Sequence, residues 1–125
     1  MHVELIREYR FEAAHLLPHL PDGHRCRRLH GHSFRFDVTL TGPVDERTGF
    51  LIDFDDLDKL VQPIVDKVDH YYLNEVEGLA NPSSEVLARW IWQRLAPELP
   101  QLTAICVAET CDARCVYRGE SWRGA

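Results

Sequence analysis

The sequence predicts an α+β fold, in which an antiparallel sheet carries two helices on one face. Segments with strand periodicity stand near both ends of the chain, and two segments with helical periodicity lie together between them. Strands and helices therefore do not alternate, as they would in a parallel doubly wound sheet. The 125 residues are enough for one domain. We expect residues 1–120 to form it, and residues 121–125 to be a disordered tail.

The first half of the chain is predicted to supply the pairing strands. Residues 2–11 alternate loosely between two faces, as a half-buried strand does, and residues 11–15 end this strand-like segment. Residues 17–28 contain Pro18, Pro21 and Gly23, which predict a loop. Residues 33–41 alternate most clearly, and residues 50–54 are predicted to be a short strand before a helix.

The second half begins with two amphipathic helices. Apolar residues recur at spacings of three and four across residues 55–68, although Pro63 predicts a kink or a break. A second helix follows the start signals at residues 81–83 and closes before Pro97 and Pro100. Residues 102–110 and 114–118 are predicted to be the last two strands.

Composition limits the classes of function. The formal net charge of −6 argues against a nucleic-acid-binding role, which normally requires a basic face. No basic and apolar leader and no apolar run long enough to span a bilayer is found, so we expect a cytoplasmic protein without a membrane partner. In that compartment the four cysteines are expected to be reduced thiols.

Three histidines are candidate metal ligands. If the strand begins at His30, its two-residue period places His30 and His32 on one face, where two imidazoles converge. His15, at the end of the first strand, is the candidate third ligand, and Cys26 stands four residues before His30. A catalytic zinc commonly takes three protein ligands and leaves one position open. The alternative is that these histidines are ordinary surface residues.

Two further side chains and one cluster have two interpretations each. Glu109 shares a strand face with apolar residues, so it requires a partner, which is either a ligand with N–H donors or an internal arginine. His70 is either functional or a helix-end histidine that satisfies a terminal carbonyl. The basic residues around Cys26 are either a phosphate site or solvated loop charges; they are His24, Arg25, Arg27 and Arg28.

Eight short motifs stand in order between about residue 5 and residue 120. They are Phe-Glu-Ala-Ala-His at residues 11–15, Cys-x-x-x-His-Gly-His at 26–32, Asp-Phe at 53–54, Asp-His at 69–70, Leu-Asn at 73–74, Asn-Pro-Ser-Ser-Glu at 81–85, Glu-Thr-Cys at 109–111 and Tyr-Arg-Gly-Glu at 117–120. Together these motifs resemble the 6-pyruvoyl-tetrahydropterin synthase superfamily, and most closely its bacterial queuosine-pathway branch. That branch is indicated by the three residues between Cys26 and His30, since the pyruvoyl enzymes have a longer gap.

The resemblance implies a fold and a set of site residues. The fold is the tunnelling fold, with a four-stranded antiparallel sheet and two helices on one side. Three subunits close a barrel and two rings stack as a homohexamer, with active sites at the subunit interfaces. It also implies that His15, His30 and His32 bind Zn²⁺, that Cys26, Asp69 and His70 are catalytic, and that Glu109 anchors the pterin ring.

The implied reaction converts 7,8-dihydroneopterin triphosphate to a 6-carboxy-tetrahydropterin, with release of acetaldehyde and triphosphate. Zinc would bind the side-chain hydroxyls as a Lewis acid and make the neighbouring C–H protons more acidic. Three alternatives remain open: 6-pyruvoyl-tetrahydropterin synthesis, a non-catalytic zinc- or pterin-binding module, and a zinc hydrolase that uses metal-bound water.

Overall fold

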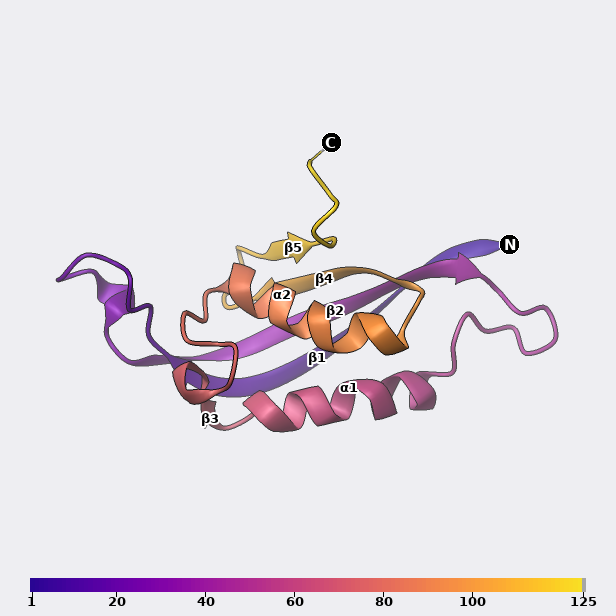
Figure 1. The fold of residues 1–125 in the computed structure, drawn as a ribbon. Coiled ribbons are helices and arrows are strands. Elements are labelled where there is room, and N and C mark those ends of the chain that lie inside the picture. Colours follow the sequence, from indigo (N-terminus) through magenta and orange to yellow (C-terminus); the bar gives the residue numbers. More distant parts are fainter. Residues whose placement is uncertain (125) are drawn as a thin grey trace.

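A twisted five-stranded sheet forms one layer of the protein and two helices form the other (Figure 1). The computed structural model describes residues 1–124. Along the sheet the strands follow the order β3-β1-β2-β4-β5. Their bounds are β1 His2–His15, β2 His30–Pro43, β3 Tyr71–Tyr72, β4 Leu102–Ala108 and β5 Cys115–Tyr117. The α+β class with two helices is therefore confirmed.

The two long strands form the centre of the sheet. β1 and β2 pair antiparallel along their whole lengths, from His2 opposite Pro43 to His15 opposite His30. β4 pairs antiparallel with β2, and the short β5 with β4. Because strand side chains alternate between faces, Phe34 and Phe36 lie on the helix-covered side together with Phe11, and all three are almost fully buried.

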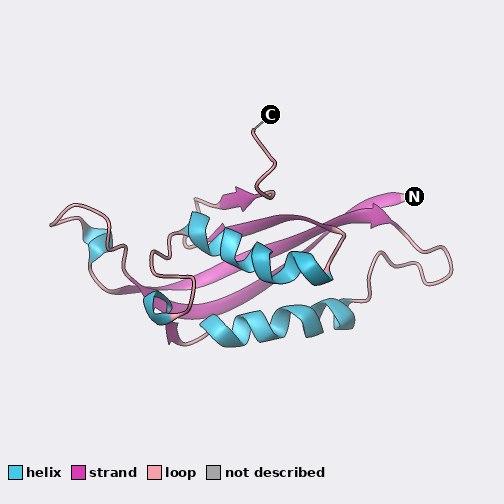
Figure 2. Ribbon diagram, viewed as in Figure 1, coloured by secondary structure: helices cyan, strands magenta, loops and turns pink. Residues whose placement is uncertain are grey.

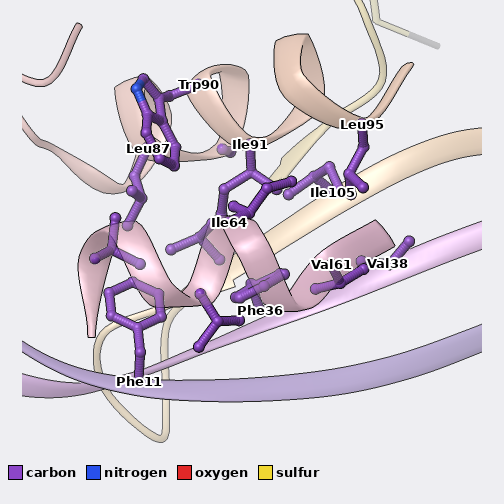
Figure 3. Packing of buried hydrophobic residues seen from close by; sticks show 14 of the residues in the cluster. Phe11, Phe36, Val38, Val61, Ile64, Leu87, Trp90, Ile91, Leu95 and Ile105 are labelled. Atoms are coloured by element: carbon purple, nitrogen blue, oxygen red, sulfur yellow. The ribbon is translucent and has the colours of Figure 1, made fainter. Parts of the chain in front are cut away.

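The helices α1 (Phe54–Val68) and α2 (Ser84–Leu95) pack on this face, as the close view of the core shows (Figure 3). Asp53 caps the N-terminus of α1, because its carboxylate accepts the Asp55 N–H. Ser83 caps the N-terminus of α2, because its hydroxyl accepts the Val86 N–H. Both helices were expected at these places. The core residues labelled in Figure 3 are Phe11, Phe36, Val38, Val61, Ile64, Leu87, Trp90, Ile91, Leu95 and Ile105.

Pro63 does not break α1, so the expected break does not occur. The helix is continuous from Phe54 to Val68. Pro63 has no N–H for the carbonyl four residues earlier, but both Pro63 and Lys59 are exposed, so water can satisfy the freed carbonyl.

Two expectations about strands were wrong, and one strand was not expected. Residues 50–53 of the predicted strand at residues 50–54 are loop (Figure 2), and Phe54 already begins α1. The carbonyl of Phe50 accepts the N–H of Asp45, at the start of the preceding turn. A short strand, β3, occurs instead at Tyr71–Tyr72. β3 runs parallel to β1, so the sheet is mixed and five-stranded rather than four-stranded and antiparallel.

The C-terminal residues continue beyond β5 as exposed turns. Residues 121–124 are exposed, and the Arg118 guanidinium lies 5.4 Å from the centre of the Trp122 ring. Ala125, the end of the expected disordered tail, lies outside the described residues. The division into residues 1–120 and 121–125 stays a prediction. Within residues 1–124, neither helix combines the length and the apolar character needed to cross a bilayer.

The core predicts a clear difference between the two faces of α1. Leu57→Ala removes a fully buried side chain from the contact between helix and sheet, and should lower the free energy of unfolding by about 2–5 kcal/mol. Lys59→Ala, on the exposed side of the same helix, should change it by about 0.5 kcal/mol or less. Urea unfolding at one fixed protein concentration measures both, and equal effects would contradict the assigned faces.

Candidate metal centre and active site

Three histidines gather at the end of the β1–β2 ladder. His15 ends β1 and pairs with His30, the first residue of β2, while His32 lies two residues further along β2 on the same face. One ring nitrogen from each histidine lies within 4.8 Å of the other two. The candidate ligands identified from the sequence therefore lie together, and as a group they could hold a metal ion.

Hydrogen bonds to backbone carbonyls orient two of the three rings. His15 Nδ1 donates to the carbonyl of Pro82 over 2.8 Å, and His30 Nδ1 donates to the carbonyl of Arg28 over 2.7 Å. A proton fixed on Nδ1 leaves the Nε2 lone pair free, which is the usual arrangement of metal-binding histidines. Burial also lowers the pKa of His15, which favours its neutral form.

Two of the three histidines, His15 and His32, carry the unsatisfied buried polar side-chain atoms. Within residues 1–124, His15 Nε2 and His32 Nε2 are buried side-chain atoms without a hydrogen-bond partner. A buried polar atom without a partner is destabilising. A cation bound by imidazole nitrogens would satisfy both atoms, so the residues present fit a metal such as zinc.

Glu109 lies beside this cluster. It follows the last residue of β4, and its Oε2 atom is 3.7 Å from His32 Nε2. Among the described residues, the side chain close to the Glu109 carboxylate is thus a histidine and not the internal arginine considered above. Glu109 also borders a cleft of about 330 Å³, lined by Ser84, Glu85, Glu109, Thr110, Ala113, Arg114 and Cys115.

Cys26 lies in a short 3-10 turn, Arg25–Arg27, in the loop between β1 and β2. Its carbonyl accepts the Leu17 N–H over 2.8 Å, which ties the turn to the segment just after His15. Its thiol borders neither the Glu109 cleft nor the cleft at His70 described below. All four cysteines are free.

The basic residues around Cys26 differ in their bonding. The Arg27 guanidinium donates to the carbonyls of Pro18 and Leu20 and lies 3.4 Å from an Asp22 carboxylate oxygen. It therefore holds the loop together. The side chains of Arg25 and Arg28 make no such contact with residues 1–124.

Asp69 and His70 form a pair in contact with β1. Asp69 Oδ1 lies 3.0 Å from His70 Nδ1 and accepts the Glu12 N–H over 2.9 Å. The His70 N–H in turn donates to the Glu12 carbonyl. These bonds hold His70 at a φ of 63°, a positive value that no other non-glycine residue among residues 1–124 has. Such a conformation costs about 1–3 kcal/mol and often marks a functional position.

The dyad is not bonded directly to the histidine cluster among the described residues. Within residues 1–124 no hydrogen bond or ion pair joins Asp69 or His70 to the three histidines or to Glu109. His70 borders another cleft, of about 630 Å³, whose walls are mostly residues of the open sheet face. His32 reaches that cleft too; the others that line it are Glu12, Ala13, Ala14, Gly31, Ser33, Tyr71 and Tyr72.

The orienting groups were not found from the sequence. The carbonyls of Pro82 and Arg28 and the peptide groups of Glu12 belong to the backbone, so no residue type marks them. The Asn-Pro-Ser segment signalled only a helix start, although it also brings the Pro82 carbonyl to His15.

Comparisons with known proteins identify related sequences and one related structure. The family model described as 6-pyruvoyl tetrahydropterin synthase matches residues 4–120. A 6-carboxy-5,6,7,8-tetrahydropterin synthase of Synechocystis sp. is 42% identical, over 90% of this chain and 91% of its own length. One from Bacillus subtilis is 32% identical, over 92% and 84%. The solved Caenorhabditis elegans 6-pyruvoyl tetrahydropterin synthase superposes with a TM-score of 0.89 at 28% identity, covering 96% of this chain and 97% of the other.

The Asp69 carboxylate predicts a specific pH dependence of stability. The Glu12 N–H and the His70 ring lower the pKa of Asp69 below its ordinary value. Its ionised form therefore stabilises the folded state above the ordinary pKa of about 4, and this contribution is lost as the pH falls through the lowered pKa. The stability difference between wild type and Asp69→Asn, from urea unfolding, should shrink on acidification. A difference that does not change with pH would contradict this.

Proposed function

Because this chain belongs to the 6-pyruvoyl tetrahydropterin synthase family, we propose that it is the family's 6-carboxy-5,6,7,8-tetrahydropterin synthase. In this proposal it converts 7,8-dihydroneopterin triphosphate and one water molecule to 6-carboxy-5,6,7,8-tetrahydropterin, acetaldehyde and triphosphate, as a step of queuosine biosynthesis in the cytoplasm. Two relatives with that printed name, at 42% and 32% identity, support this choice of reaction. The confirmed part of the prediction is that the chain is a lyase of this family.

The main structural support is the convergence of His15, His30 and His32 beside Glu109. In the proposal the three Nε2 lone pairs hold Zn²⁺, which would act as a Lewis acid on the side-chain hydroxyls of the substrate. Glu109 would accept two hydrogen bonds from the N–H groups at the guanidine-like edge of the pterin. The cleft of about 330 Å³ beside Glu109 offers space for a flat ring.

The proton transfers are assigned to Cys26 and His70. Cys26 would exchange a proton with the carbon side chain of the substrate as its thiolate, with the loop arginines as nearby cations. His70 would be the second acid and base, because Asp69 Oδ1 at 3.0 Å from Nδ1 fixes the orientation of the ring. These roles rest on the family motifs. For His70 they rest also on its positive φ and on its two contacts, with the Asp69 carboxylate and the Glu12 carbonyl.

We also propose that the active form is a homohexamer of two stacked trimers. β1 pairs with β3 only at Ala13 and Ala14, so most of its outer edge has no strand partner within residues 1–124. Apolar side chains stand on the open face of the sheet, with Ile6 58% and Val116 38% exposed. In a closed barrel of three sheets, this edge of β1 would pair with the sheet of a neighbouring subunit. The dyad of one subunit would then lie next to the histidine cluster of the next.

The reaction is tested by product analysis. Zinc-loaded protein incubated with 7,8-dihydroneopterin triphosphate should yield a 6-carboxy-tetrahydropterin by mass spectrometry, and acetaldehyde in a coupled assay. Cys26→Ala should lower the turnover roughly 10²–10⁴-fold while zinc remains bound.

Other products identify the alternatives. A pyruvoyl product without acetaldehyde would assign the activity of the Caenorhabditis elegans structural neighbour, and phosphate release without acetaldehyde would indicate a zinc hydrolase. Binding of zinc and pterin without turnover would leave only a binding module.

Sharing of sites between subunits predicts complementation. Cys26→Ala and His70→Ala are each inactive in this proposal, but mixed oligomers contain sites with an intact Cys26 from one subunit and an intact His70 from its neighbour. Random mixing restores roughly one quarter of the sites. Analytical ultracentrifugation should give a hexamer, and a monomer or a mixture without activity would contradict the shared site.

A further inference from the structure

Asn74, in the short 3-10 helix η2 (Leu73–Glu75), uses its side-chain amide to join three segments of the chain. Its Oδ1 accepts the Leu16 N–H over 3.0 Å, and its Nδ2 donates to the Leu16 carbonyl over 2.9 Å. Nδ2 also donates to the Ala80 carbonyl over 3.3 Å. We propose that Asn74 is a positioning residue for the metal ligand His15, an inference that rests on the metal site of the proposed function.

The first two bonds hold the backbone of the ligand. The β1–β2 ladder ends at the pair His15–His30, so Leu16 is the first residue beyond strand pairing. The Asn74 amide donates to and accepts from the same residue, as a neighbouring strand would. It therefore extends the restraint on β1 by one residue, at the place where the strand would otherwise fray.

The third bond holds the segment that orients the ring. Ala80 lies two residues before Pro82, whose carbonyl accepts the His15 Nδ1–H. The same side chain therefore fixes both the backbone of His15 and the loop that supplies its hydrogen-bond acceptor. Since the His15 side chain is 1% exposed and its Nε2 has no partner within residues 1–124, the direction of this lone pair depends on these two restraints.

Groups that orient a metal-binding histidine from outside the ligand set commonly contribute 10–100-fold to metal affinity. Asn74 is one such group here, acting through Leu16 and through the Ala80–Pro82 segment rather than by contact with the metal. Asn81 is the matched control. It is also an asparagine and lies between Ala80 and Pro82, but its side chain makes no hydrogen bond within residues 1–124.

The test measures metal binding directly. The zinc Kd of wild type, Asn74→Ala and Asn81→Ala is obtained by competition with a chromophoric chelator. Asn74→Ala should weaken binding about 10–100-fold, whereas Asn81→Ala should change it less than about 3-fold. The visible absorption bands of Co²⁺ in the fully loaded proteins should also shift in Asn74→Ala, because the geometry of the ligands changes. A merely structural role would leave the spectrum of the loaded protein unchanged.

Two further variants separate the role of Asn74 from the existence of the metal site. Asn74→Asp keeps the acceptor for Leu16 N–H and loses both donated bonds, so it should also bind zinc more weakly, and it serves if Asn74→Ala does not fold. Wild-type affinity and spectrum in the Asn74 variants would overturn this inference. His15→Ala reports on the proposed function itself: unchanged zinc binding there would refute the metal site, whatever the Asn74 variants do.

Discussion

The antiparallel pairing of β1 with β2 is the constraint on which the rest of the structure depends. Its register places His15 opposite His30 and, through the two-residue alternation, places His32 on the same face. The same alternation directs Phe11, Phe34 and Phe36 toward the helices. A slip of one residue would turn every side chain of one strand to the other face, so the core and the histidine cluster share one determinant.

Around that ladder lie the groups whose local surroundings are energetically unfavourable, at places where a bound ligand could supply the missing interactions. Two imidazole nitrogens are buried without a partner, Glu109 stands within 4 Å of one of them, and His70 has a backbone conformation unfavourable for its residue type. The core is otherwise apolar, with Thr39 the other buried polar residue among residues 1–124. Unfavourable local energies are therefore concentrated at the two clefts and near the dyad, as is common at functional sites.

Periodicity predicted the long strands, the two helices and the faces they bury, because these features are encoded by neighbouring residues. It placed His30 and His32 together for the same reason. It failed at β3, since a strand of two residues has no period, and at residues 50–54, where turn residues surround a short apolar run. The break expected at Pro63 does not occur, because the effect of proline depends on whether the freed carbonyl meets water, which is a property of the assembled fold.

In the candidate site, too, some features could be predicted from residue types and others depend on the assembled fold. Residue types indicated the three histidines and Glu109 as unusual, and the resemblance added Asp69. The contact of the dyad with the backbone of β1 could not be inferred, because it depends on where α1 ends relative to β1. The groups that orient His15 and His30 are peptide carbonyls, which every residue carries, so only the folded chain identifies them.

Those carbonyl partners have a consequence for the evolution of the site. A carbonyl is present whatever side chain occupies the position, so substitution at residue 28 leaves the acceptor for His30 in place, and substitution at residue 82 does so for His15 as long as the local backbone is kept. A change in the number of residues between η2 and α2 would instead move the acceptor itself. The orientation of His15 therefore depends on the length of the segment between η2 and α2, which no single residue type encodes.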